Sequence, residues 1–105
     1  MLFRSRVLCT SDTGHFDGLC VDDDDHIWVA AGPGGTIERR DLDGELSARI
    51  TLPAGFVTSV CFSGADPNTL FATVSDCSLT DGQGAVLSVH VAVPGTIPAP
   101  VAFAL

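Results

Sequence analysis

Short strand-forming segments recur along the whole chain, and this recurrence limits the fold more than any other feature. Apolar and polar residues alternate with a period of two in one segment after another. No segment keeps the 3.6-residue period of an amphipathic helix. Residues that favour turns separate the segments, as at Gly32–Gly35, Asp41–Gly44 and Asp66–Asn68. The sequence therefore predicts an all-β protein.

The expected strands differ in exposure. Thr36–Arg40 carries three charged residues and is expected to be more exposed than its neighbours, whereas Ser75–Gly84 is expected to be a polar loop. The full set of expected strands is Leu2–Leu8, Leu19–Val21, Ile27–Ala31, Thr36–Arg40, Leu46–Leu52, Val57–Phe62, Leu70–Val74, Ala85–Val93 and Val101–Leu105.

The strands follow an internal repeat. Leu19–Val21 corresponds to Val60–Phe62, 41 positions later, and Trp28–Ala30 corresponds to Phe71–Thr73, 43 positions later. A four-stranded repeat of roughly 40 to 50 residues is typical of a β-propeller blade, and propellers close with about four to eight blades. The chain has room for two. The predicted organisation is a partial propeller domain over 1–105, in which residues 1–13 end a preceding blade, 14–53 form one blade and 54–105 form the final blade.

Charge and hydropathy exclude some classes of partner. The net charge is −8, with 13 acidic residues against five basic ones, so binding to nucleic acid is not expected. The mean hydropathy of +0.37 allows a core, but the apolar runs are too short for a signal peptide or a membrane span. We therefore expect a cytoplasmic protein. The four cysteines form no C-x-x-C pair and are expected to pack rather than bind metal: Cys9, Cys20, Cys61 and Cys77.

Aspartates crowd one short stretch, with Asp17 followed by the run Asp22–Asp25. The run stands between two predicted strands and is typical of a turn whose side chains bond the backbone or face water. It does not fit a calcium-binding EF-hand loop, which needs Gly at position six and Glu at position twelve, where this chain has Ile27 and Pro33.

Several ordered motifs resemble the senescence marker protein (regucalcin)/gluconolactonase family. "FDGLCVDDDDHIWVA" followed by "GGTIERRDLDGEL" is similar to the P-D-G-L-containing strand pair of that family. "VTSVCFSGADPNTLFATVS" and "GAVLSVHVAVPG" are similar to segments near the family's C-terminus. The resemblance runs from about Arg4 to the end of the chain. It implies a normally six-bladed propeller that hydrolyses sugar lactones with one divalent cation (Ca²⁺, Mg²⁺, Mn²⁺ or Zn²⁺) at the mouth of its channel.

The resemblance also assigns a role to Asp17. The family's cation is held by a Glu near the N-terminus, an Asn of a middle blade and the Asp of the P-D-G motif, which is Asp17 here, with Phe16 in place of the proline. Asp17 is therefore the candidate metal ligand and catalytic base, and a turn or capping aspartate is the alternative. His15 could assist from nearby, or could simply be an exposed loop residue. Thr58 stands at the equivalent place in the second repeat.

The other two ligands have no counterpart in this chain. We therefore expect the C-terminal part of a metal-dependent lactonase, with a small-molecule lactone as substrate, that is inactive alone and binds cations weakly or not at all. The alternatives are a non-catalytic truncated propeller fragment and a two-blade module that associates through its open blade faces. Three copies would supply six blades, but Leu2–Leu8 would then be a surplus strand, because the second blade is expected to contain four already.

Overall fold

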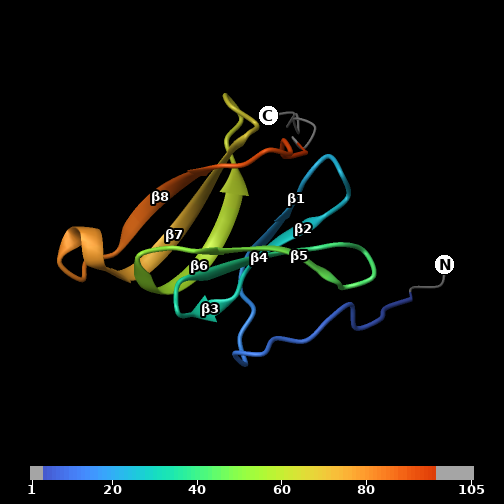
Figure 1. The fold of residues 1–105 in the computed structure, drawn as a ribbon, viewed down its shortest axis with the longest axis horizontal. Coiled ribbons are helices and arrows are strands. Elements are labelled where there is room, and N and C mark those ends of the chain that lie inside the picture. Colours follow the sequence, from blue (N-terminus) through green and yellow to red (C-terminus); the bar gives the residue numbers. More distant parts are fainter. Residues whose placement is uncertain (1–3, 97–105) are drawn as a thin grey trace, which may run out of the picture.

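The computed structural model describes residues 4–96 and consists of two antiparallel sheets of four strands (Figure 1). The strand order is β1-β2-β4-β5 in the first sheet and β3-β6-β7-β8 in the second. The elements are β1 (Leu19–Val21), β2 (Ile27–Ala30), β3 (Gly32–Pro33), β4 (Thr36–Arg40), β5 (Leu46–Thr51), β6 (Ala54–Phe62), β7 (Thr69–Cys77), the 3₁₀ turn η1 (Ser78–Thr80) and β8 (Ala85–His90). The prediction of an all-β chain with two four-stranded antiparallel blades is confirmed.

Cross-strand pairing follows the repeat that the sequence indicates. Cys20 on β1 pairs with Trp28 on β2, and Cys61 on β6 pairs with Phe71 on β7. The neighbouring pair Leu19 and Val29 has its counterpart in Val60 and Ala72, one repeat later. The two sheets are therefore built on the same register.

The hydrophobic core lies between one face of each sheet. Trp28 and Ile37 enter it from the first sheet, and Val57 and Leu70 enter it from the second; all four are almost fully buried. The Trp28 ring meets the ring of Phe62 edge-on, with 6.5 Å between centroids. Each sheet thus uses one face for this core and turns its other face outward.

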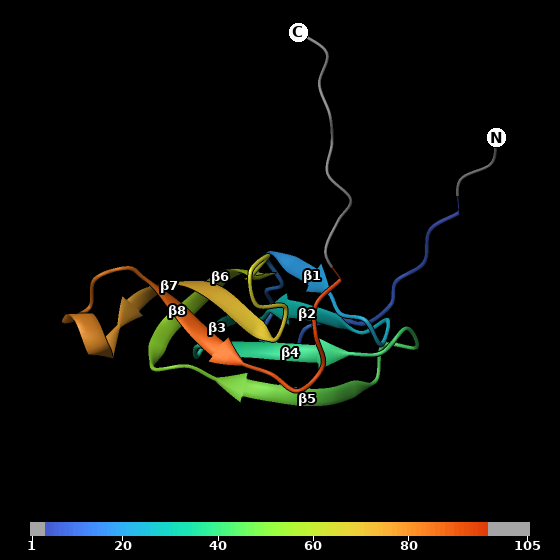
Figure 2. The same ribbon diagram turned by 90° about the horizontal axis from the view of Figure 1, so that it is seen from above.

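The strands β1 and β6 adjoin where the two sheets meet (Figure 2). The Gly18 amide donates to the Thr58 carbonyl at 3.0 Å, just before β1 begins. A Cβ at Gly18 would lie 2.4 Å from Ser59 Oγ, so only glycine permits this approach. This contact places the residues that precede β1 beside β6.

Two expected strands are not part of the structure that is described. Residues 4–8 form no strand, which contradicts the described part of the Leu2–Leu8 prediction. They lack a partner strand within the described chain, and without one an extended segment gains no ladder hydrogen bonds. The predicted strand Val101–Leu105 lies outside the described residues. Within residues 4–96, the second sheet consequently has three long strands and the two-residue β3.

Other boundaries differ from the sequence prediction. Gly32 and Pro33, expected in a turn, pair with Val57 and Phe56 as β3, which leaves Gly34 and Gly35 to turn with positive φ. Ser75–Cys77, expected in a loop, extend β7 because β6 already begins at Ala54 and offers them partners.

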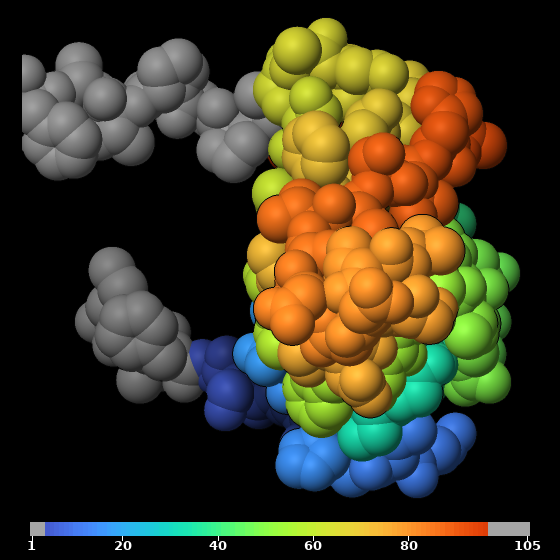
Figure 3. Space-filling view, turned by 90° about the vertical axis from the view of Figure 1, so that its left-hand side faces the viewer, coloured from blue at the N-terminus to red at the C-terminus, as the bar shows by residue number. Residues whose placement is uncertain are grey.

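The β4 prediction also needs correction. This strand is less exposed than its charges suggested, because Ile37 and Glu38 are both buried. The predicted strand Ala85–Val93 ends at His90 as β8. The connection between β7 and β8, coloured orange, projects from one side of the molecule in Figure 1 and faces the viewer in Figure 3. None of the described residues forms a helix that is long and apolar enough to span a membrane.

Candidate functional site

Asp17 is exposed and stands two residues before the start of β1, the strand that adjoins β6. Its amide donates to the Ala30 carbonyl at 2.9 Å, and the Gly18 carbonyl accepts from the Ala30 amide, also at 2.9 Å. The next amide, that of Gly18, is bound to Thr58 on β6. The backbone on both sides of the Asp17 side chain is therefore held by two different strands.

The Asp17 carboxylate accepts no hydrogen bond and forms no ion pair with another residue in the part of the chain that the structure describes. Aspartates that shape turns in this protein behave differently. Asp41 Oδ1 accepts from the amides of Asp43 and Glu45, both at 2.9 Å, and Asp66 Oδ1 accepts from the Asn68 amide at 3.1 Å. The alternative of a turn or capping role thus has no hydrogen bond to support it at Asp17.

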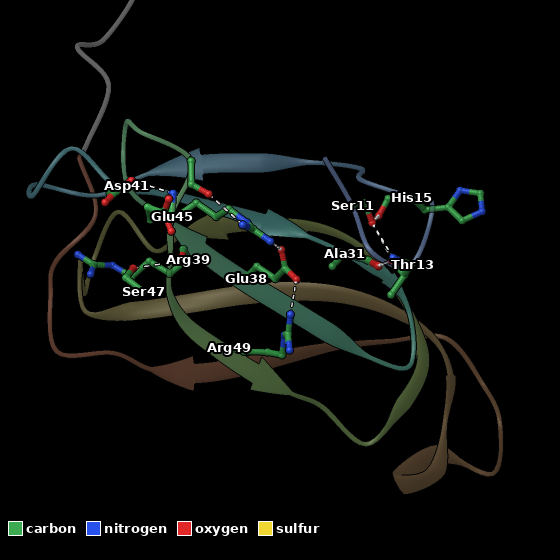
Figure 4. Close-up of polar contacts among 12 residues, drawn as sticks. Ser11, Thr13, His15, Ala31, Glu38, Arg39, Asp41, Glu45, Ser47 and Arg49 are labelled. Carbon is green, nitrogen blue, oxygen red and sulfur yellow. Dashed lines mark hydrogen bonds and ion pairs between the residues drawn. The ribbon is translucent and has the colours of Figure 1, made fainter. Parts of the chain in front are cut away.

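The loop before Asp17 is pinned to the end of β2. Thr13 Oγ1 donates to the Ala31 carbonyl at 2.9 Å, and Ser11 Oγ lies within hydrogen-bond distance of both Thr13 Oγ1 and the His15 carbonyl (Figure 4). The His15 ring points away from these bonds and meets Phe56 edge-on, 6.2 Å between centroids. His15 is exposed, so the structure gives it a packing contact and no polar partner among the described side chains.

Thr58, which matches Asp17 in the repeat, is tied to the neighbouring strand. Its Oγ1 lies 2.7 Å from Thr73 Oγ1 and 3.2 Å from the Thr73 carbonyl. A shallow groove of about 190 Å³ borders Asp17 on the outer face of the first sheet. Its lining is mainly apolar: Leu8, Cys9, Phe16, Asp17, Leu19, Ile27, Val29 and Arg40.

Asp22, expected at a turn, is fully buried and forms the largest polar cluster of this region. Its Oδ2 accepts from Trp28 Nε1 at 2.9 Å and from Arg39 Nε at 2.8 Å. Its Oδ1 accepts from the amides of Asp24 and His26, at 2.9 and 3.1 Å. Burial alone would raise the pKa of Asp22, but the hydrogen bonds from Arg39, His26, Trp28 and Asp24 outweigh it, so that the pKa is lowered.

The turn prediction therefore holds for the backbone of this run and for Asp22 Oδ1, which bonds two backbone amides. It missed the burial of Asp22 and the bonds of Oδ2 to Trp28 and Arg39. Alternation along β4 and β2 was the signal that could have revealed it, since Trp28 and Arg39 pair across those strands and point to the same face.

A second buried carboxylate lies on the outer face of the first sheet. Glu38 Oε1 accepts from Arg40 Nη2 at 2.7 Å, and Glu38 Oε2 accepts from Arg49 Nη2 at 2.9 Å (Figure 4). Burial raises the pKa of Glu38, but the two arginines lower it further, and the net pKa lies below its usual value. Because both oxygens already hold cationic partners, Glu38 is a structural residue rather than a free ligand.

Within residues 4–96, no three His, Cys, Asp or Glu side chains are placed so that they could hold a metal ion. Protein sites for Ca²⁺, Mg²⁺ or Zn²⁺ need about four to eight ligands, several of them from the protein. Asp17 alone does not fit such an ion. The described residues therefore supply at most one ligand of the cation that the resemblance implies.

Comparison with known proteins decides the family. The family model for the SMP-30/gluconolactonase/LRE-like region matches residues 3–76. The chain belongs to this family. In the pentonolactonase XacC of Haloferax volcanii, 36% of 104 aligned residues are identical, covering 88% of this chain and 36% of the relative. The regucalcin of Danio rerio is 40% identical over 71 residues, covering 67% of this chain and 24% of the relative.

A structural comparison agrees with the propeller-type fold class of this family member. A solved luciferin-regenerating enzyme, a β-propeller-type protein, superposes with a TM-score of 0.64 at 26% identity. The match covers 77% of this chain and 30% of that one. The chain thus spans roughly a quarter to a third of the proteins that it resembles, and it is a member of a gluconolactonase-like family.

Proposed function

We propose that this chain contributes Asp17 and the two blades around it to a lactone-hydrolysing site whose other residues lie in blades outside the chain. The observation that carries the proposal is the exposed Asp17 carboxylate, which has no hydrogen-bond partner in the described structure although its backbone is fixed by β2 and β6. A side chain that stabilised the turn would be bonded to it. The name of the Haloferax relative, a pentonolactonase, supports the lactone as the class of substrate.

Asp17 would perform one role in lactone hydrolysis. Hydrolysis of a lactone requires water to attack the carbonyl carbon, after which the ring C–O bond breaks and the ring oxygen takes up a proton. A carboxylate near the carbonyl accepts the proton that the attacking water loses. Asp17 would serve as this base, or as one oxygen ligand of a cation held mainly by other blades. Since the described residues do not fit a metal, we derive no step through one.

A chimera tests the role of Asp17. The stretch of the Haloferax pentonolactonase that matches this chain is replaced by the chain itself, and hydrolysis of a pentonolactone is measured. We expect the folded chimera to turn over lactone, and Asp17→Asn to lower kcat/KM at least about 100-fold, as expected for the loss of a general base. The chain alone should show no turnover.

Asp25→Asn provides the matched control. Asp25 is also exposed, and its positive φ of 56° is tolerated by Asn, so this variant removes one negative charge without disturbing the backbone. It should leave kcat/KM of the chimera unchanged. A chimera that is folded by circular dichroism and equally active with Asp17→Asn would contradict the proposal and favour a non-catalytic role for this region.

A further inference from the structure

Asp17 stands at the end of a short strand pairing. β1 contains three residues, and the bond from the Asp17 amide to the Ala30 carbonyl is the last hydrogen bond between β1 and β2 at this end. Hydrogen bonds at the ends of a pairing open more easily than those in its middle. The position of the Asp17 carboxylate therefore depends on what holds this end of the pairing closed.

Thr13 supplies a hydrogen bond one residue beyond that end. Its Oγ1 donates to the carbonyl of Ala31, which directly follows Ala30, the partner of Asp17. β2 ends at Ala30, and among the described residues only the Thr13 hydroxyl donates to the Ala31 carbonyl. Ala31 is 1% exposed, so its carbonyl has little access to water and needs a donor from the protein.

The loop around Thr13 is folded on itself and directs the Thr13 hydroxyl at Ala31 (Figure 4). The Thr13 amide donates to Ser11 Oγ at 3.1 Å, and Ser11 Oγ also lies 3.2 Å from the His15 carbonyl. His15 packs on the residue that follows Ala31, since a Cβ at Gly32 would lie 3.0 Å from the His15 Cβ. The loop therefore meets the end of β2 through one hydrogen bond and one packing contact.

The bond between Thr13 and Ala31 is the main attachment of this loop. In the part of the chain that the structure describes, it is the one hydrogen bond that joins residues 9–16 to a residue outside them. Both partners belong to this chain, so the attachment is independent of what packs on the outer faces of the two sheets. Loss of the Thr13 hydroxyl would leave the bond between Asp17 and Ala30 as the unprotected end of the pairing.

We propose that Thr13 is a positioning residue for Asp17. Its hydroxyl closes the pairing of β1 with β2 one residue beyond Asp17 and so holds the carboxylate in one place relative to the reacting lactone and water. A catalytic group loses much of its effect when it is displaced by about 1 Å, so a strand end that opens costs turnover. The inference rests on the proposed role of Asp17 in hydrolysis, but the closing of the strand end is measurable without a substrate.

Amide hydrogen exchange in the purified chain, followed by NMR, measures the closing directly. Thr13→Val removes the hydroxyl and keeps the shape of the side chain, whereas Thr13→Ser keeps the hydroxyl. The Asp17 amide should exchange at least about fivefold faster in Thr13→Val than in Thr13→Ser, because a buried carbonyl loses its donor. The amides between β6 and β7 should exchange equally in both variants. Equal exchange of the Asp17 amide in the two variants, or faster exchange of all amides alike in Thr13→Val, overturns the proposal.

The chimera with the Haloferax pentonolactonase tests whether the closing matters for hydrolysis. Thr13→Val should lower kcat about twofold to fivefold, because kcat scales with the fraction of molecules in which the strand end is closed. KM should stay unchanged, since the Thr13 hydroxyl is bonded to Ala31, and Thr13→Ser should restore kcat. Thr80→Val is the matched control: Thr80 Oγ1 also bonds backbone carbonyls, those of Cys77 and Gln83, but in the connection between β7 and β8. It should leave kcat unchanged.

The outcomes separate this inference from the proposed function. A folded chimera without turnover, or one that keeps full activity with Asp17→Asn, overturns the proposed function and with it the positioning role of Thr13. A chimera that depends on Asp17 but has the same kcat with Thr13→Val and Thr13→Ser overturns only the inference about Thr13. A raised KM at unchanged kcat in Thr13→Val also overturns it, because that result would mean that Thr13 acts in substrate binding.

Discussion

Replacement of Asp22 by asparagine should strongly destabilise the protein, although three more aspartates follow it. The side chain of Asp22 has no exposed surface, and its Oδ2 holds both Trp28 Nε1 and Arg39 Nε. Asparagine can present only one oxygen. If that oxygen keeps the two backbone amides, its NH₂ group faces the two donors that Oδ2 served, and Arg39 loses its buried anion.

The expected loss of unfolding free energy is about 3 kcal/mol. Removing one partner of a buried ion pair costs about 3–5 kcal/mol, and the lower end applies because Arg39 is 14% exposed and Asp24 Oδ2 lies 3.8 Å from its Nη2. A domain of this size has roughly 5–15 kcal/mol of stability in total. The variant should therefore remain folded at room temperature but lose a large share of its stability.

Urea unfolding followed by fluorescence measures this loss directly, because Trp28 is the single tryptophan of the chain and lies in the affected cluster. Asp25→Asn makes the same chemical change at an exposed position and should cost less than about 0.5 kcal/mol. Equal urea midpoints for the two variants, at equal slopes, would refute the assignment of Asp22 as the stabilising member of the run.

Two further predictions concern acid and thiol chemistry. The folded-state pKa values of Asp22 and Glu38 lie below their ordinary values of 3.8 and 4.5. The contribution of these two carboxylates to stability is complete above their ordinary pKa values and is lost as the pH falls through the lowered pKa values. At pH values below about 4, the urea concentration at the unfolding midpoint should therefore decrease, and it should decrease less steeply in Asp22→Asn. Burial, with Cys61 and Asp22 nearby, raises the pKa of Cys20 to about 12. In iodoacetamide labelling followed by peptide mass spectrometry, exposed Cys61 should react first, and Cys20 and fully buried Cys77 should react last; earlier labelling of Cys20 would contradict this order.

Local patterns predicted most strands of this protein because each depends on neighbours in sequence. Alternation and turn residues located β1, β2, β4 and β5 to within a residue or two. The repeat also relates the cross-strand pairs to each other, since Cys20–Trp28 corresponds to Cys61–Phe71 at offsets of 41 and 43 positions. Ends that depend on a distant partner were missed: Gly32 and Pro33 form a strand only because β6 passes beside them.

The candidate site was predictable in part for the same reason. A motif placed Asp17 before β1, and the structure puts it there with an unbonded carboxylate in an exposed position. Its role remains a prediction, and the groove beside it was not anticipated, because residues from the N-terminal segment, β1, β2 and β4 line it together. Such convergence depends on the path of the chain between strands, which alternation does not encode.

The sequence by itself determined that this chain is all-β, that it repeats after about 41 residues, and which side chains share a face of each strand. Only the tertiary structure decided which of those faces is covered. Trp28 and Phe71 occupy the same position in the repeat, yet one is buried and the other is exposed. The tertiary structure also decided the burial of Asp22, because the side chains of Trp28 and Arg39 bond its carboxylate and cover it. Alternation is a property of one strand, whereas burial depends on which sheet lies opposite, and that is settled by contacts between residues far apart in the chain.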